Sequence, residues 1–250
     1  MGKSKNKKTI LALALILVCI AAIYLVRIYK RFTTTVHATS ASNRVKGNPN
    51  AVTKIVEYMD FQCGACAQSA EYLKKFFNDK GDQFYLEIKY FPLEEIHQHT
   101  IFAARYAECS AQQGKFWPVH DGLFARQKDW HKMINPDSVF REIANNAGVD
   151  LKKLDACLDS EAVGEAIAQN KAEGLALGVN STPSYFVNGK MVVGLKSLEQ
   201  ALTDPNFKDW IEPGKNFMDL PKVADHPFAG NRTDWNQTVN TQQSQQGAPN

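Results

Sequence analysis

The feature that most constrains the fold is an apolar run of strand length that passes directly into a segment of helical period. Residues 53–61, TKIVEYMDF, are apolar on both alternating faces, which predicts a central strand covered on both sides. A few residues later, apolar positions recur at the three-to-four spacing of an amphipathic helix: Cys66, Ala70, Leu73 and Phe77. With Gly81 as a stop signal, the pattern predicts a strand followed at once by a helix.

Other short signals predict more strands and helices. Residues 83–92 predict a second strand, which ends at Pro92. Residues 184–194, SYFVNGKMVVG, place two β-rich runs around Asn-Gly, the strongest short signal for a hairpin, and residues 197–204 predict a last helix. Between the second strand and the hairpin, residues 98–178 are alanine-rich and helical in period. This order predicts an α/β sheet that carries a helical insertion.

The positive charge of the chain is concentrated at its start. The net charge is +3, but residues 47–250 carry 20 of the 29 basic residues and all 26 acidic ones, a net charge of −6. A nucleic-acid-binding domain would need a basic patch of its own. We therefore exclude nucleic acid as a partner.

An uncharged apolar segment, TILALALILVCIAAIYLV, occupies residues 9–26 and is preceded by four lysines. It is long enough to cross a bilayer as a helix, and a secretory signal has a shorter apolar stretch. We therefore favour an uncleaved signal anchor over a cleaved signal with its site near Ala38. Cys19 then lies within the membrane as a small apolar side chain.

Composition divides the chain into an anchor, a linker, a domain in two parts, an insertion and a tail. The linker is rich in Ser, Thr and Asn, and the end of the tail is dominated by Gln, Asn and Thr, which predicts disorder. The expected boundaries are 1–31 for the anchor, 32–50 for the linker, 51–97 and 179–204 for the sheet-bearing domain, 98–178 for the inserted helical domain and 205–250 for the C-terminal extension.

Cys63 and Cys66 are separated by two residues at the predicted start of a helix. Unpaired backbone N–H groups and the helix dipole favour the thiolate of Cys63 there. Cys66 lies on the helix face that turns into the core. An exposed nucleophile beside a buried partner that resolves the mixed disulfide is the division of roles that thiol–disulfide exchange requires.

Glu57 interrupts the apolar strand. A carboxylate in a strand covered on both sides is costly unless it is protonated or has a task. With its pKa raised by desolvation, it would pass a proton to or from Cys66 during exchange. The alternative is a side chain that escapes to solvent at a sheet edge.

The segments VEYMDFQCGAC and GVNSTPSYFVNGK resemble the active-site strand and helix and the cis-proline loop of thioredoxin-fold proteins. The block between them, with FPLEEIHQHTIFAARYAEC and QGKFWPVHDGLF, resembles the DsbA-like subfamily, which has a helical domain inserted into a thioredoxin fold. The resemblance extends from near Ala51 to Asp204 and implies an α/β thioredoxin fold with an inserted helical domain. The predicted transmembrane helix would precede it.

The resemblance also implies roles for individual residues. Cys63 would be the attacking cysteine, Cys66 the resolving one and Glu57 the buried acid. Thr182 and Pro183 would form the loop whose cis peptide lies against the disulfide and whose backbone pairs with the substrate. No cofactor is implied.

The chain departs from DsbA between the two cysteines, where Gly64-Ala65 replaces Pro-His. Neither residue offers a charge or a donor side chain to the Cys63 thiolate, so the direction of electron flow stays open. As an oxidase, the protein would be reoxidised by a quinone-linked membrane partner of the DsbB or VKOR type. As a reductase or isomerase, it would be kept reduced by a membrane reductant carrier.

The expected setting is the bacterial inner membrane, with a single membrane pass and the catalytic domain on the periplasmic side. The expected substrates are cysteine-containing secreted or envelope proteins. A rival from another class is a non-catalytic metal-binding or chaperone module whose cysteine pair holds copper or zinc. A cis-proline loop packed on the sulfurs would exclude the metal.

The remaining cysteines and the histidines receive structural interpretations. Cys109 and Cys157 lie on predicted helices of the insertion, and an oxidising compartment favours a structural disulfide between them over two separate buried thiols. The spacing of the histidines does not fit a zinc site with Cys63 and Cys66. We therefore predict no metal centre and expect solvated or capping histidines at positions 97, 99, 120 and 131.

Overall fold

The computed structural model describes residues 13–28 and 43–204. Residues 13–28 form a helix with exposed side chains. Within these two ranges, we find no helix that combines the length and the apolar character of a membrane span. The segment predicted as an anchor starts at Thr9, outside the described residues, and the predicted C-terminal extension and most of the linker also lie outside them. The membrane anchor stays a prediction.

Five strands form one sheet in the order β1-β3-β2-β4-β5. The strands are β1 (Val45–Gly47), β2 (Thr53–Met59), β3 (Phe84–Tyr90), β4 (Ser184–Val187) and β5 (Lys190–Val193). β2 pairs in parallel with β3 and antiparallel with β4, while β1 and β5 add antiparallel edges. The predicted central strand is confirmed, and so is the hairpin, which turns at Asn188 and Gly189 with positive φ at both residues.

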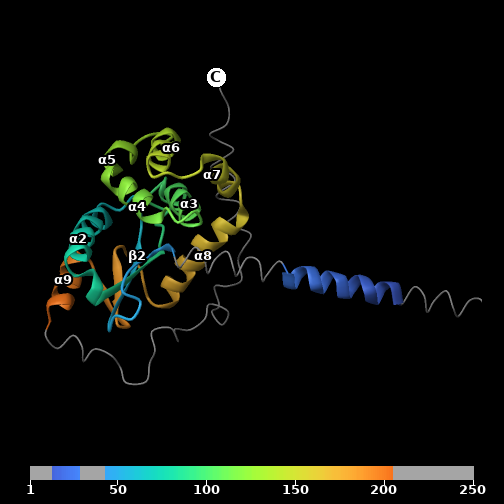
Figure 1. The fold of residues 1–250 in the computed structure, drawn as a ribbon, viewed down its shortest axis with the longest axis horizontal. Helices are drawn as coiled ribbons and strands as arrows, with labels where there is room; N and C mark the ends of the chain where they lie inside the picture. Colours follow the sequence, from blue (N-terminus) through green and yellow to red (C-terminus); the bar gives the residue numbers. More distant parts are fainter. Residues whose placement is uncertain (1–12, 29–42, 205–250) are drawn as a thin grey trace, which may run out of the picture.

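Helices cover both faces of this sheet, and a helical block is inserted between β3 and β4. The helices are α2 (Gly64–Lys80), α3 (Thr100–Ala111), α4 (Phe116–Ala125), α5 (Gln127–Trp130), α6 (Asp137–Asn146), α7 (Leu151–Leu158), α8 (Glu161–Ala176) and α9 (Leu195–Thr203), with a 3-10 turn at Gly81–Gln83. α2 and α9 lie on one side of β2 and α8 on the other, and the rest of the insertion gathers beyond the sheet (Figure 1). The predicted helical insertion is confirmed.

The linker predicted for residues 32–50 is wrong in its last part. Residues 45–47 form β1 and pair with β3. Arg44 is buried, forms a salt bridge with Glu108 of α3, and donates from Nε to the carbonyl oxygen of Ile88 at 3.2 Å. Because these partners lie 44 and 64 residues away in sequence, the local composition of the segment carries no sign of them.

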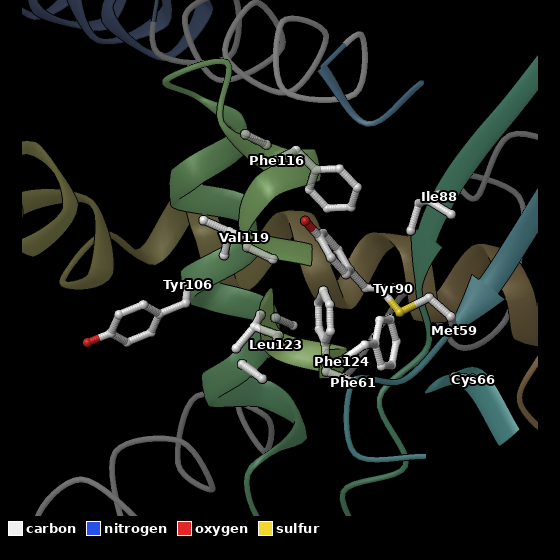
Figure 2. Packing of buried hydrophobic residues seen from close by; sticks show 14 of the residues in the cluster. Met59, Phe61, Cys66, Ile88, Tyr90, Tyr106, Phe116, Val119, Leu123 and Phe124 are labelled. Carbon is white, nitrogen blue, oxygen red and sulfur yellow. The ribbon is translucent and has the colours of Figure 1, made fainter. Parts of the chain in front are cut away.

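The core has two parts, one on each face of the sheet. Alternate residues of β2 divide between them: Ile55, Glu57 and Met59 face α2, while Val56 and Tyr58 belong to the cluster on the α8 side. The larger cluster continues from β2 and β3 into the insertion, where aromatic side chains of α4 meet Met59 and Ile88 (Figure 2). The site therefore lies where the sheet, α2 and the insertion share one core.

Cys109 of α3 and Cys157 of α7 form a disulfide, with 2.08 Å between their Sγ atoms. It joins two helices of the insertion that are 48 residues apart in sequence at the bridge. A cross-link over such a length restricts the unfolded chain more than the folded one. The bridge therefore stabilises the insertion.

We expect the Cys109→Ala/Cys157→Ala double variant to lower the free energy of unfolding by about 2–4 kcal/mol, because the unfolded chain regains the entropy that the bridge removes. Urea unfolding of the oxidised protein measures this change. Cys19→Ala, at an exposed cysteine outside the domain, is the matched control and should leave the midpoint unchanged. Equal midpoints for the double variant and the control would contradict a stabilising bridge.

Candidate active site

Cys63 and Cys66 occupy different environments at the start of α2. Cys63 is the N-cap residue, with extended backbone, and its side chain is half-buried. Cys66 lies in the first turn and is 0% exposed. Both are free thiols in this structure. A substrate sulfur can therefore reach Cys63 while Cys66 stays beneath it.

Several donors favour the thiolate of Cys63. A hydrogen bond from the Cys66 side chain makes the largest contribution and, with others from Thr182 and from the backbone N–H groups of Cys66 and Ala65, outweighs the opposing effect of burial. Together they lower the pKa of Cys63 from 9.0 to about 6. At neutral pH, Cys63 is therefore largely a thiolate, which is the nucleophilic form of cysteine.

The Thr182-Pro183 loop lies against Cys63. The peptide bond between these residues is cis, and Cys63 Sγ lies 3.4 Å from the carbonyl oxygen of Thr182, to which it donates only when it is protonated. The Thr182 hydroxyl is buried and makes no other hydrogen bond in the described residues, so it is free to turn its hydrogen toward the thiolate. The structure thus brings together the two cysteines and the loop that the sequence predicted.

Glu57 lies beneath Cys66 on the central strand. Its side chain is 3% exposed, and Oε1 accepts a hydrogen bond from the Tyr185 hydroxyl at 3.2 Å. The alternative of a side chain that reaches solvent at a sheet edge is therefore excluded, because β3 and β4 flank β2. Burial raises the pKa of Glu57 to about 8; the bond from Tyr185 opposes this, and the Cys63 thiolate adds to it.

Burial likewise raises the pKa of Cys66, and the Cys63 thiolate and the Glu57 carboxylate raise it further. Cys66 is thus a thiol under the conditions in which Cys63 is a thiolate. For Cys66 to attack a disulfide, its proton must move to an acceptor, and Glu57 is the buried group with a pKa near neutrality. The predicted roles of both residues fit this geometry.

Sequence reasoning missed Asp60, which fixes the loop before Cys63. Its side chain is buried and accepts hydrogen bonds from Gln62 N, Leu93 N, His97 Nδ1 and Thr100 Oγ1. These donors come from the loop itself and from the chain entering the insertion. Asp60 directly follows the apolar strand β2. A carboxylate at this position, just before the two cysteines, is the one feature of the sequence that could have indicated its role.

His97 is the titratable group that this network brings near the site. The hydrogen bond to Asp60 makes the largest contribution to raising the pKa of His97, and the Cys63 thiolate adds to it, against the effect of burial. His97 is partly exposed, but His99 and His120 are each 4% exposed. Of the predicted alternatives, solvated or capping histidines, the solvated one is therefore wrong for these two. His99 does stand at the N-cap position of α3, although its side chain makes no capping hydrogen bond there. Among the described residues, no group of three or more His, Cys, Asp or Glu side chains could hold a metal ion.

Comparisons with known proteins agree with the fold. The family model described as Thioredoxin matches residues 39–212. A thioredoxin-like oxidoreductase from Silicibacter pomeroyi DSS-3 is 28% identical, with a TM-score of 0.51, over 64% of this chain and 92% of that one. BdbD from Bacillus subtilis (22% identity, TM-score 0.52, 60% and 83% coverage) and alpha-DsbA1 from Wolbachia pipientis (20%, 0.55, 66% and 88%) have the same fold.

Curated proteins similar in sequence carry the name of an antiporter. The Na(+)/H(+) antiporter NhaA of Herminiimonas arsenicoxydans is 32% identical over 152 residues, which are 61% of this chain and 23% of that protein. NhaA 1 of Mycolicibacterium gilvum (strain PYR-GCK) is also 32% identical, over 59% of this chain and 24% of its own length. The chain spans about a quarter of the length of these relatives.

The Cys63 thiolate can be titrated by its absorbance in the ultraviolet. We expect an apparent pKa of about 6, and a higher value in Thr182→Val, because valine keeps the shape of threonine but offers no hydrogen to the thiolate. Thr203→Val, at an exposed threonine on α9, is the control. An unchanged titration in Thr182→Val would show that the hydroxyl does not stabilise the thiolate.

Glu57→Gln should raise the free energy of unfolding in alkaline but not in acid solution. The pKa of Glu57 rises on folding from an ordinary 4.5 to about 8, so the folded state binds the proton more tightly and loses stability as pH rises between these values. The uncharged amide of glutamine removes this loss. The free energy of unfolding should therefore rise on the order of 4 kcal/mol at about pH 8.5 and should not change near pH 4. Chemical denaturation at both pH values measures it.

The control for this measurement is Glu71→Gln on the exposed face of α2, which should change stability little at either pH. A gain in Glu57→Gln that is the same in acid and in alkaline solution would contradict a raised pKa and point to packing instead.

Proposed function

Since the chain belongs to the thioredoxin family, we propose that it is a DsbA-like thiol–disulfide oxidoreductase. It works as an oxidase that transfers the Cys63–Cys66 disulfide to cysteine pairs of secreted or envelope proteins. The observation that carries this proposal is the contrast between the two sulfurs. Cys63 has a pKa of about 6, while the pKa of Cys66 is raised well above 9.0.

The low pKa of Cys63 bears on the direction of electron flow. The donors that favour the thiolate act only when the bond between the two sulfurs is broken, because a disulfide carries no charge. They therefore stabilise the dithiol form of the enzyme and make its disulfide a stronger oxidant. Gly64-Ala65 contributes no donor side chain, but Cys66, Thr182 and the backbone do.

The exchange then proceeds in two steps with balanced electrons. A substrate thiolate attacks Cys63 Sγ, the Cys63–Cys66 bond breaks, and Cys66 takes a proton from Glu57. The second substrate thiolate attacks the substrate sulfur of the mixed disulfide, and Cys63 leaves as its stabilised thiolate. The substrate has lost two electrons to the enzyme dithiol, and its disulfide is released.

The reverse step requires the same groups. When Cys66 attacks a mixed disulfide, Glu57 takes its proton, so the same site also reduces or isomerises disulfides if a reductant keeps it in the dithiol form. The reduction potential decides between these uses. A metal-binding module is less consistent with the site, since the Thr182 carbonyl oxygen already contacts Cys63 at 3.4 Å.

We further propose that the enzyme acts from a membrane anchor on the periplasmic side of the bacterial inner membrane. The support is the uncharged segment at residues 9–26, preceded by four lysines, and the exposed apolar side chains of the helix at residues 13–28. Its reoxidant would be a quinone-linked membrane protein of the DsbB or VKOR type, which reaches Cys63 in place of a substrate. An oxidising compartment also fits the disulfide at Cys109.

The reduction potential of the Cys63/Cys66 couple tests the proposed direction. We expect a value nearer that of DsbA, about −120 mV, than that of thioredoxin, about −270 mV, because the low pKa of Cys63 stabilises the dithiol. Equilibration of the full chain with glutathione buffers measures it. A value at or below that of thioredoxin would overturn the oxidase and favour the reductase.

Substitution of single cysteines tests the mechanism. Cys63→Ser should abolish exchange with a dithiol peptide, and Cys66→Ser should accumulate mixed disulfides at Cys63, because the resolving sulfur is missing. Non-reducing electrophoresis with mass spectrometry reads out both results. Cys19→Ala is the control. Full activity in Cys63→Ser would refute the proposed function.

A further inference from the structure

A histidine of α4, His120, has no part in the exchange steps, although it lies in the core near Glu57. His120 is 4% exposed. Four aromatic rings enclose it, with centroids 5.0 to 5.8 Å from its own: Phe61, Phe116, Trp117 and Phe124. Three of these, Phe61, Phe116 and Phe124, gather between the insertion and the strands (Figure 2). A polar side chain in such a place requires an explanation.

Asp121 orients the imidazole. His120 Nδ1 lies 3.0 Å from Asp121 Oδ1, and Lys74 Nζ lies 2.9 Å from Asp121 Oδ2. Burial opposes the ionisation of Asp121, but the hydrogen bonds from His120 and Lys74 lower its pKa to about 2. Because a carboxylate only accepts hydrogen bonds, Nδ1 carries the hydrogen and Nε2 of the neutral ring is left as a proton acceptor.

His120 and Glu57 line one small cavity between α2, the sheet and α4. Its apolar walls are Ala70, Leu73, Leu86, Ile88 and Trp117, and its other polar residues are Lys46, Lys74 and Asp121. The space open to the centre of a water molecule is about 10 Å³, which is about what a single water needs. One water between Glu57 and His120 would thus link two buried groups that both exchange protons.

Burial, together with two nearby lysines, favours the neutral ring of His120. The groups that face it are Asp121 on its own helix, Lys46 of β1, Lys74 of α2 and, across the cavity, Glu57 of β2. Burial lowers the pKa of His120 most, the two lysines lower it further, and Asp121 opposes them. The Lys74 side chain is 56% exposed, so this end of the cavity reaches solvent.

We propose that His120, oriented by Asp121, relays protons between Glu57 and solvent through this cavity. The proposal rests on the proposed exchange at Cys63. When Cys66 takes the proton of Glu57, the resulting carboxylate regains one through the cavity water from His120 Nε2, which accepts it from solvent near Lys74. One proton moves inward, no electron moves, and His120 returns to its neutral form. In the reverse reaction the proton moves outward.

Such a route has a physical purpose. Cys66 is 0% and Glu57 3% exposed, so neither exchanges protons directly with water. A substrate in a mixed disulfide covers Cys63, the accessible sulfur of the pair, together with the Thr182-Pro183 loop beside it. A path that leaves by way of α4 stays open while the substrate is bound. His120 acts through Glu57 and is thus a positioning residue.

The test is His120→Gln in the full chain, since glutamine keeps a polar group of similar size that cannot carry a proton. We expect the single-turnover rates of peptide oxidation and of enzyme reduction to fall together, on the order of tenfold at about pH 7 to 8, where proton transfer limits the rate. The loss should be smaller at high buffer concentration, because buffer molecules then supply and remove the proton. The equilibrium constant with glutathione and the titration of Cys63 should not change, because a relay affects rates in both directions equally.

A partial variant guards against a folding defect. Asp121→Asn changes a residue with a 25% exposed side chain. It should slow peptide oxidation and enzyme reduction alike, but less than His120→Gln does, because an amide can also donate to Nδ1 and so no longer fixes the hydrogen of His120 on that nitrogen. In Glu57→Gln/His120→Gln, the second substitution should add nothing to the first, since the relay serves Glu57 alone. An additive loss in the double variant would overturn the proposal.

His99→Gln is the matched control, because His99 is equally buried and does not line the cavity; it should leave the pH profile unchanged. Unchanged rates in His120→Gln would overturn the relay, and so would a shifted equilibrium constant, which indicates an electrostatic role. If Cys63→Ser stays active, the exchange mechanism itself fails. If Cys63→Ser is inactive while His120→Gln is normal, only the relay fails.

Discussion

The burial of Cys66 and Glu57 beneath the first turn of α2 is the constraint on which the site depends. Both groups are shut away from water, so the pKa of each rises. Cys63 lies only three residues before Cys66 but at the helix N-terminus, where donors lower its pKa. The same short segment thus holds one ionised sulfur and one protonated sulfur. Exchange can begin at Cys63 without competition from Cys66. Attack by Cys66 on a mixed disulfide requires that its proton first move to an acceptor.

The insertion takes part in building this site rather than merely covering it. Thr100 of α3 donates to Asp60, and Gln127 Nε2 of α5 donates to the carbonyl oxygens of Phe61 at 2.8 Å and of Cys63 at 3.0 Å. These bonds hold the loop between β2 and α2 from the side of the insertion. Because the core runs without interruption from the sheet into the helices, the orientation of Cys63 depends on both parts of the fold.

The sequence predicts those features whose cause is local. The apolar run of β2, the helical spacing from Cys66 onward and the Asn-Gly turn at residue 188 act within a few residues, and each appears where it was expected. Arg44 and His120 show the limit. Arg44 is buried because Glu108 is folded against it, and His120 is buried by aromatic rings from another segment as well as its own helix. Partners so distant leave no pattern of spacing in the chain.

The dipeptide between the cysteines illustrates how far a family pattern constrains the chemistry. Gly64 and Ala65 are exposed, and a side chain at Gly64 would meet nothing within 4 Å. The interactions that lower the pKa of Cys63 come instead from Cys66, from Thr182 and from backbone N–H groups. All of these are fixed by the fold rather than by the dipeptide. Each acts on the thiolate and none on the disulfide, so together they stabilise the dithiol form, which is the basis of the proposed direction of electron flow.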